Sequence, residues 1–423
     1  MKFKEKICIL GLGYVGLPLA FEFSKKFKVT GFDLNIQKIK NLKNNIDITG
    51  EIELKNLNKL NKIFFTSDIE SCKDCNIFIV TVPTPILKNK KPDLSYLKKA
   101  SSFISRVIKK NDLVVYESTT YPGCTEEICI PIIEKKSKLI LNKDFLCGYS
   151  PERVNPSDKK HKIPNINKIV SGSNSKALRK VFNLYKKIIK AKIIKTSTIK
   201  VAEAAKVIEN TQRDINIAFV NELMIIFNRL NIDTNEILKA ASSKWNFLKF
   251  NPGLVGGHCI GVDPYYLEFK AKQLGIKPQV ISAGRNINDS IPKFVVKEIL
   301  KILKSKKNFK NKTQTLILGI TFKENCNDFR NSKILDIITL LKKNGHNIDV
   351  FDPVVDSNLL FKEHGIKLVK KLKKNNYDVV LGAVSHNYFL NKKKNYFLKL
   401  IREKGFIYDL KNMLDKDEKI FKP

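Results

Sequence analysis

The sequence contains little arginine, little acid and no long apolar run. Of its 423 residues 78 are basic, yet only eight of these are arginine, and Asp and Glu together number 41, which leaves a net charge of +37. Such a surplus first suggests a nucleic-acid or membrane-surface partner. Nucleic-acid-binding proteins, however, rely on arginine for bidentate contacts, and the lysines here are spread along the whole chain. We therefore interpret them as solvated surface lysines and expect no nucleic-acid partner.

Other absences narrow the class of protein further. No stretch of 18 apolar residues is present, so we expect no membrane span, and the first residues do not resemble a signal peptide. The eight cysteines lack a disulfide-like spacing, and the Cys72-x-x-Cys75 pair has neither a second pair nor a nearby histidine. We accordingly expect no metal site and no redox motif, and a reducing, cytoplasmic location.

The length and the patterning predict an α/β protein of two to three domains. Short apolar runs that read as strands alternate with helical patterns in the first half of the chain, at Lys6–Leu10, Lys28–Phe32, 77–82 and Leu113–Tyr116. A second alternating pattern opens near residue 313, with strands expected at 315–319, 347–351, 378–384 and 406–408. Alternation of this kind is typical of a parallel sheet covered on both faces.

A long helix is expected between these two regions. Apolar residues keep helical spacing for more than 30 residues after the possible N-cap residues Thr196 to Thr198, without Pro or Gly. We therefore predict two Rossmann-like doubly wound domains joined by a central helical domain, with boundaries at 1–195, 196–305 and 306–423. The long helix is also the expected site of an oligomer contact.

A glycine-rich turn follows the first predicted strand. Gly11-x-Gly13-x-x-Gly16 opens a helix, and Asp33 ends the second strand 20 residues after Gly13. The glycines let backbone N–H groups approach a pyrophosphate at the helix N-terminus, while the carboxylate accepts hydrogen bonds from a ribose. Because that carboxylate would repel a 2′-phosphate, the motif favours NAD over NADP.

A second glycine-rich segment surrounds a cysteine. Glycines 253, 256, 257 and 261 lie close to Cys259 and Asp263, and glycine at this density usually marks the close approach of backbone to a ligand. Cys259 is a candidate nucleophile if its surroundings favour the thiolate. His258 would point away from it in an extended segment, so we do not predict His258 to be its base.

Further polar residues lie on the long helix and in two loops. Lys206, Asn210 and Arg213 share one helical face, where a partly buried lysine can neutralise an oxyanion. The loop 150–156 places Glu152-Arg153 between prolines, and the loop 322–330 carries Lys323 and Arg330, which suit phosphate.

Together these motifs resemble the UDP-glucose/GDP-mannose dehydrogenase family over the whole chain. The matching segments are Gly11-Leu-Gly-Tyr-Val-Gly16, Val82-Pro-Thr84-Pro, Glu117-Ser-Thr119-Thr-Tyr-Pro-Gly123, Ser150-Pro-Glu-Arg153, Lys206-x-x-x-Asn210, Gly256-Gly-His-Cys-Ile-Gly-Val-Asp263 and Phe322-Lys-Glu-Asn325. The resemblance implies an NAD-dependent four-electron oxidation of a sugar C6 alcohol to a carboxylate.

The resemblance also implies roles for individual residues. Cys259 would form a thiohemiacetal and then a thioester, which water hydrolyses. Lys206, Asn210 and Asp263 would handle the proton and the oxyanion, and Glu152 and Thr119 would order the water and the nicotinamide end. NAD would contact Gly11, Gly13, Tyr14, Val15, Gly16, Asp33, Thr84, Thr119 and Arg330. The UDP-sugar would contact Arg153, Val154, Lys206, Asn210, Arg213, Gly256, Phe322, Lys323 and Lys411.

Within the family, the chain looks most like the branch that oxidises UDP-N-acetylhexosamines for surface polysaccharides of capsule or O-antigen type. Members that act on UDP-ManNAc carry an arginine fourteen residues before the cysteine, where this chain has Trp245. This difference favours UDP-GlcNAc or UDP-GalNAc, between which no single residue decides. UDP-ManNAc and UDP-glucose oxidation remain alternatives, and more distant ones are a β-hydroxyacid dehydrogenase and a nucleic-acid-binding protein. A homodimer or a higher homo-oligomer is expected.

Overall fold

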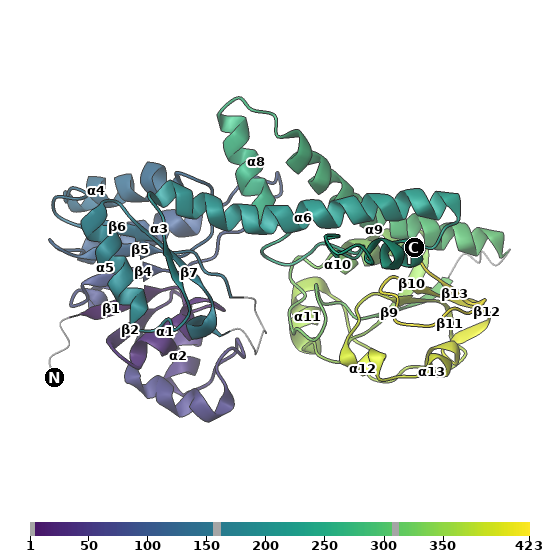
Figure 1. Cartoon of the computed structure of the whole chain (residues 1–423). Coiled ribbons are helices and arrows are strands. Elements are labelled where there is room, and N and C mark those ends of the chain that lie inside the picture. Colours follow the sequence, from purple (N-terminus) through teal and green to yellow (C-terminus); the bar gives the residue numbers. More distant parts are fainter. Residues whose placement is uncertain (1–4, 155–161, 307–312) are drawn as a thin grey trace. The chain divides into compact units, whose positions relative to one another are not determined.

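The computed structural model describes residues 5–154, 162–306 and 313–423. The chain divides into two compact units, of which the first contains Met1–Glu209 and Tyr265–Lys277 and the second contains Asn210–Pro264 and Pro278–Pro423. Figure 1 shows strands with helices packed around them in each unit.

The first unit is built on an eight-stranded sheet with the order β3-β2-β1-β4-β5-β6-β7-β8. The pairs are parallel except for β6 and β7, which run antiparallel, so the sheet is mixed at one side. Its central strands are buried throughout, as expected for a sheet covered on both faces. The strands are β1 Lys6–Leu10, β2 Lys28–Phe32, β3 Ile63–Thr66, β4 Ile77–Val80, β5 Leu113–Tyr116, β6 Leu146–Tyr149, β7 Lys168–Gly172 and β8 Ile193–Lys195.

Two helices of the first unit, α2 and α5, begin at side-chain caps. Asn35 and Asn174 each accept a hydrogen bond from a backbone N–H in the first turn of α2 and α5. The apolar sides of α1 and α5 contribute to the main core of the unit. The helices are α1 Gly16–Ser24, α2 Ile36–Lys43, α3 Ser95–Val107, α4 Ile130–Ser137 and α5 Ser175–Lys186.

The predicted long helix is α6, Ile199–Leu230, with 32 residues. The Thr198 hydroxyl oxygen accepts a hydrogen bond from the Val201 N–H at 3.2 Å, so the expected cap is present. After α6 come α7 Thr234–Ala241, α8 Asp263–Gln273 and α9 Gln279–Ser305.

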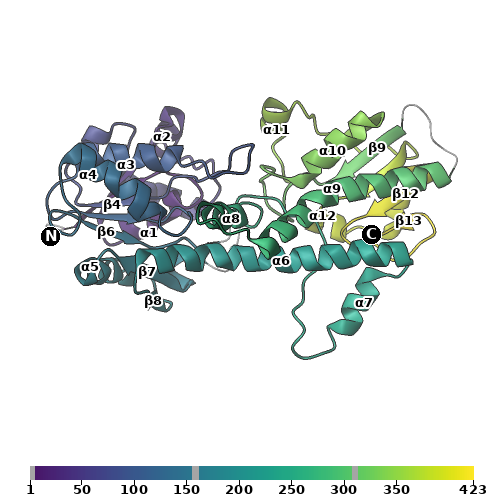
Figure 2. The same ribbon diagram turned by 90° about the horizontal axis from the view of Figure 1, so that it is seen from above.

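The second unit contains a five-stranded parallel sheet with the order β10-β9-β11-β12-β13. Alternate residues of a strand enter different cores. Val379 and Leu381 of β11 pack with α9 and α10, whereas Val380 packs on the face of α12 and α13. Figure 2 shows α9 and α10 side by side. The elements are β9 Thr313–Leu318, α10 Lys333–Lys343, β10 His346–Phe351, α11 Ser357–His364, β11 Tyr377–Gly382, α12 Asn387–Leu390, α13 Lys394–Leu398, β12 Ile401–Asp409 and β13 Ile420–Phe421.

The predicted fold class is confirmed, with two α/β sheets and one long helix. The strand expected over 77–82 stops at Val80. The domain boundaries at 195 and 305 stay a prediction, and the Asn155-Pro156 end of one motif lies outside the described residues. Among the helices that the structure describes, none is long and apolar enough to cross a membrane.

Candidate active site

The glycine-rich turn of the first unit has the geometry that a dinucleotide needs. Gly11 has φ +95°, and its N–H donates to the Phe32 carbonyl at 2.8 Å. A Cβ on Gly16 would lie 1.8 Å from the Gly11 carbonyl oxygen, so only glycine permits this crossing. A Cβ on Gly13 would meet no atom within 4 Å, and it would enter the open space in front of the turn. Because no side chain caps α1 at Val15, its first N–H groups can meet a phosphate.

Asp33 lies at the end of β2, beside this turn. Its Oδ2 accepts a hydrogen bond from the Leu12 N–H at 2.9 Å, and its Oδ1 accepts one from the Asn35 N–H at 2.9 Å. Lys38 donates to Oδ2 at 2.7 Å, a contact that sequence reasoning missed. The turn, the uncapped helix and the carboxylate together fit the adenosine diphosphate half of NAD.

The loops after β4 and β5 carry the predicted contacts Thr84 and Thr119, whose side chains are both half-buried. The Thr84 carbonyl accepts a hydrogen bond from the Tyr266 hydroxyl, which ties its loop to α8. Beyond Thr119, Glu203 accepts the N–H groups of Gly123 at 2.5 Å and Thr125 at 2.9 Å. Burial raises the pKa of Glu203 to about 7. Glu203 therefore holds the loop that contains Gly123 and Thr125.

Glu152 belongs to a buried charge cluster that sequence reasoning did not anticipate. The Lys168 Nζ lies 3.3 Å from Glu152 Oε2 and 2.7 Å from Glu117 Oε2. The Tyr185 hydroxyl donates to the other Glu117 oxygen. Glu152 Oε1 also accepts the N–H groups of Arg153 and Val154, at 2.6 and 2.7 Å. Glu152 thus fixes the backbone that carries the predicted substrate contacts.

The two carboxylates of the cluster differ in the direction in which their pKa is shifted. Burial raises the pKa of Glu117 to about 7. Burial also opposes ionisation of Glu152, but Lys168 and the two backbone N–H groups outweigh it and lower the pKa of Glu152. Next to the cluster, Arg153 pairs with Glu209 of α6 at 2.7 Å. Val154 packs against the apolar core and makes no polar side-chain contact.

The predicted residues of α6 differ in their surroundings. Lys206 is 8% exposed. The Asn210 amide donates to Asp263 Oδ2 at 2.6 Å, so two predicted catalytic residues lie together in the second unit. Arg213 is exposed. Arg213 therefore remains a sequence-based prediction.

The Cys259 loop of the second unit is held by glycine packing. Gly257 has φ +80°, and a Cβ there would lie 2.7 Å from the Phe322 ring. A Cβ on Gly256 would lie 2.7 Å from the Asn331 carbonyl oxygen. The missing Cβ atoms of these glycines let the two loops pack closely, and the contact of Gly256 with a substrate stays a prediction. Cys259 itself is exposed, and its carbonyl accepts the Asp263 N–H at 2.8 Å at the start of α8.

Several predicted substrate contacts line one small cavity in the second unit. Gly256, Phe322, Lys323 and Lys411 all border it. Burial lowers the pKa of Lys411, and such a buried cation is a suitable partner for phosphate.

Arg330 makes a bidentate pair with Asp328, at 2.9 and 2.7 Å, and His258 lies 3.4 Å from the same carboxylate. Burial opposes ionisation of Asp328, yet these two partners hold its pKa well below the usual range. His258 therefore interacts with Asp328, in line with the expectation that it does not serve Cys259.

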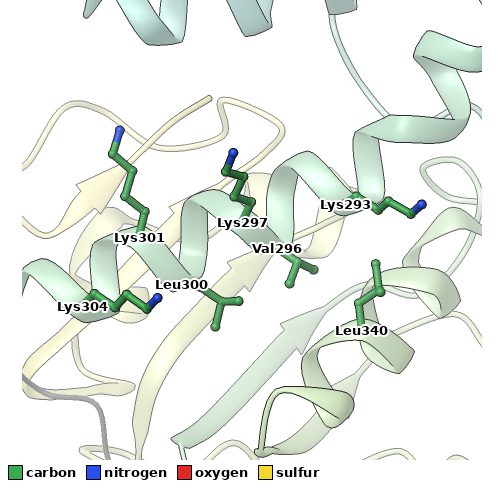
Figure 3. A pocket seen from close by; sticks show the side chains of 7 residues that line it. All are labelled: Lys293, Val296, Lys297, Leu300, Lys301, Lys304 and Leu340. Atoms are coloured by element: carbon green, nitrogen blue, oxygen red, sulfur yellow. The ribbon is translucent and has the colours of Figure 1, made fainter.

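The larger hollow of the second unit contains none of the predicted residues. It is a groove of about 450 Å³ over α9 and α10, formed by Lys293, Val296, Lys297, Leu300, Lys301, Lys304 and Leu340. Figure 3 shows Val296 and Leu300 directed toward Leu340, while Lys297 and Lys301 point away. The groove offers no nucleophile or carboxylate, so it is no candidate for catalysis. Within the described residues no group of three or more His, Cys, Asp and Glu could hold a metal ion.

The fold and the sites define an NAD-binding dehydrogenase with a second nucleotide-binding unit, and comparison with known proteins agrees. Family models for the NAD binding, central and UDP binding domains match residues 5–189, 200–290 and 316–416. The chain belongs to the UDP-glucose/GDP-mannose dehydrogenase family.

Individual relatives are similar over their full length. The chain is 50% identical over 413 residues to the UDP-N-acetyl-D-glucosamine 6-dehydrogenase of Salmonella typhi, a match that covers 98% of this chain and 97% of the relative. It is equally similar to the enzyme of that name from Pseudomonas aeruginosa, over 98% of each chain. The solved UDP-D-ManNAc dehydrogenase of Pyrococcus horikoshii superposes with a TM-score of 0.89 at 28% identity, over 99% of this chain and 98% of that one.

We expect different defects from alanine at the second and the third glycine of the turn. We expect Gly13→Ala to leave thermal stability unchanged but to weaken NAD binding by about tenfold or more, because its methyl group enters the space of the pyrophosphate. Gly16→Ala should destabilise the protein by about 1–3 kcal/mol through overpacking. Fluorescence titration with NAD and thermal denaturation measure both effects. Wild-type NAD affinity in Gly13→Ala would contradict this assignment.

Removal of the Lys168 ammonium group from the buried charge cluster should lower the stability of the protein strongly. Lys168→Met leaves Glu117 and Glu152 buried without a cation, so we expect a loss of about 3–5 kcal/mol in the free energy of unfolding. The matched control is Lys110→Met, which removes an exposed ammonium group 3.6 Å from Asp144 and should have no measurable effect. Chemical denaturation compares the two variants. Equal stabilities would show that the cluster is not a buried ion-pair network.

Proposed function

We propose that the protein oxidises the C6 hydroxyl of UDP-N-acetyl-D-glucosamine to the carboxylate, with two NAD⁺ consumed per sugar. The observation that carries the proposal is the single exposed cysteine, which follows a packed Gly-Gly step and precedes Asp263, itself bonded to Asn210. The names of the relatives at 50% identity support the N-acetylglucosamine substrate. The UDP-ManNAc alternative has weaker support, because relatives with that name are about a third identical.

The fit of NAD to the first unit rests on the turn geometry described above, and NAD⁺ accepts a hydride in each of the two oxidations when it is bound. The Cys259 thiol adds to the C6 aldehyde and forms a thiohemiacetal. Loss of a hydride and a proton then gives a thioester, and water releases the carboxylate and the free thiol. The covalent bond keeps the aldehyde in place between the two oxidations.

Five polar residues would assist these steps. We assign to Lys206 the stabilisation of the oxyanion, because a buried ammonium group is strong in this role. Asn210 and Asp263, which bond to each other, would position the proton acceptor and the hydrolytic water. Thr119 and Glu152 would order the nicotinamide end, with Glu152 acting through the backbone of the Arg153 loop.

The UDP moiety would contact Gly256, Phe322, Lys323 and Lys411, which border the small cavity of the second unit. Arg153, Val154 and Arg213 would contact the sugar, and Arg330 would contact NAD, as the family resemblance implies. Tyr14 and Val15 would contact NAD at the start of α1. We place the reaction in the cytoplasm, since none of the eight cysteines is in a disulfide.

We also propose a homodimer formed through α6. Phe219, Ile226 and Leu230 are 54%, 46% and 58% exposed, and their spacing of seven and four places them on one face of the helix. Trp245 is 92% exposed in the same unit. Apolar side chains this exposed on one helix face are typical of an interface.

Product stoichiometry tests the proposed reaction. We expect two NADH per UDP-GlcNAc, with UDP-GalNAc, UDP-ManNAc and UDP-glucose turned over less efficiently. Cys259→Ala should form no uronic acid, because the aldehyde has no nucleophile, whereas the control Cys75→Ala removes a buried thiol and should still give two NADH. One NADH per substrate in the wild type would favour a simple alcohol dehydrogenase. Full turnover by Cys259→Ala would exclude the thioester.

A substitution that introduces a charge on the exposed face of α6 tests the proposed dimer. We expect Phe219→Glu to shift the protein to a monomer in light scattering, because the carboxylate would be buried without a partner. Leu359→Glu on α11 is the matched control, since Leu359 is similarly exposed at 47% and α11 lies apart from α6 in Figures 1 and 2. An unchanged mass for Phe219→Glu would rule out this interface.

A further inference from the structure

The loop that carries Phe322 and Lys323 is anchored by a buried histidine. His386 follows β11 and is 0% exposed. Its Nδ1 accepts a hydrogen bond from the Asn325 N–H at 2.9 Å. Its Nε2 lies 3.2 Å from both Asp352 Oδ2 and the Thr321 hydroxyl. One imidazole ring therefore links the end of β10 to both sides of Phe322 and Lys323.

The contacts of His386 define its tautomer. Since the Asn325 N–H can only donate, Nδ1 must accept and the ring proton lies on Nε2. The Thr321 hydroxyl donates to the Lys323 carbonyl at 2.8 Å, which closes the turn. The Nε2–H is directed at the Asp352 carboxylate, and Asp352 also accepts the Ile320 N–H at 2.8 Å.

A second contact fixes the same loop. The Asn325 amide donates to Asn387 Oδ1 at 3.1 Å, and the Asn387 N–H donates to Asn325 Oδ1 at 2.9 Å. Asn325 has φ +54°, a left-handed conformation that asparagine tolerates better than most residues. The backbone of residues 321–325 is thereby held from β10 and from the His386-Asn387 segment.

Asp33 of the first unit corresponds to Asp352 of the second unit, but its side chain has different surroundings. Gly11 donates to the Phe32 carbonyl and Leu12 to Asp33, and in the same way Gly319 donates to the Phe351 carbonyl and Ile320 to Asp352. The side chain of Asp33, however, keeps 12% exposure beside Lys38. The side chain of Asp352 is fully buried under His386, so it cannot offer a carboxylate to a ribose.

We propose that His386 is a positioning residue for the UDP-sugar. Asp352 occupies the place of the ribose-binding acid in the second nucleotide-binding fold, and its contact with His386 serves instead to hold the loop 321–325. Phe322 then packs against Gly257 of the Cys259 loop, and Lys323 faces the UDP cavity. The assignment of the cavity to UDP rests on the proposed function.

UDP itself is the probe that tests this proposal, by calorimetric titration of the full-length protein. We expect His386→Phe, which keeps the ring but removes both nitrogens, to weaken UDP binding and raise the KM for UDP-GlcNAc by about tenfold or more. The KM for NAD should change less than about twofold. His386→Gln supplies one acceptor and one donor and should recover most of the loss.

The matched control is His346→Phe. His346 is also buried in this sheet, at 4% exposure, but it lies at the opposite end of β10 and bonds to Thr315. We expect it to lower thermal stability without changing UDP affinity. If His386→Phe fails to fold, Asn387→Ala removes the hydrogen bond that the Asn325 amide donates to Asn387 Oδ1, and should weaken UDP binding by a few fold.

The possible outcomes distinguish the positioning role of His386 from the proposed oxidation of UDP-GlcNAc. Wild-type UDP affinity in a folded His386→Phe protein, or an equal loss in His346→Phe, would overturn the role of His386. If the wild type binds UDP but forms no NADH from UDP-GlcNAc, the proposed function fails and the positioning role stands.

Discussion

The second unit depends on a single packing constraint, the Gly256-Gly257 step. Neither position tolerates a Cβ, because one would lie 2.7 Å from the Asn331 carbonyl oxygen and the other 2.7 Å from the Phe322 ring. The exposed Cys259 comes two residues after Gly257, and the backbone that leads to it is therefore packed against the loop 321–331. The same loop is anchored by His386 and borders the cavity with Lys411. This fixed backbone would give Cys259, the proposed nucleophile, the preorganisation that covalent catalysis requires.

The first unit achieves comparable order with buried charge. Lys168 holds Glu152, Glu152 holds the Arg153 backbone, and Arg153 pairs with Glu209. Burying the ionisable side chains of Lys168, Glu117 and Glu152 away from water costs free energy unless each one has a partner of opposite charge. Such an arrangement costs stability but restricts the loop to one conformation. In both units, long-range contacts position the loops at the carboxyl ends of parallel strands, where α/β folds bind ligands.

Much of the fold was predictable because it is encoded locally. The β1-turn-α1 segment, the helix α6 and its Thr198 cap follow from periodicity and glycine spacing. The residues missed share a different property. Lys168 reads as one more lysine in a lysine-rich chain, and only its burial against Glu117, 51 positions away, shows its role. His386 lies 61 positions from Asn325. Partners so distant leave no periodic signal in a single sequence.

The central claim is that Cys259 carries the substrate covalently. Mass spectrometry of protein that is quenched with acid during turnover of UDP-GlcNAc and NAD⁺ tests this claim most directly. The account predicts an adduct with the mass of the UDP-N-acetylglucosaminuronyl group on the Cys259 peptide, and no adduct in Cys259→Ser at the same time points. An adduct on another residue, or full oxidation with no adduct at any quench time, would contradict it.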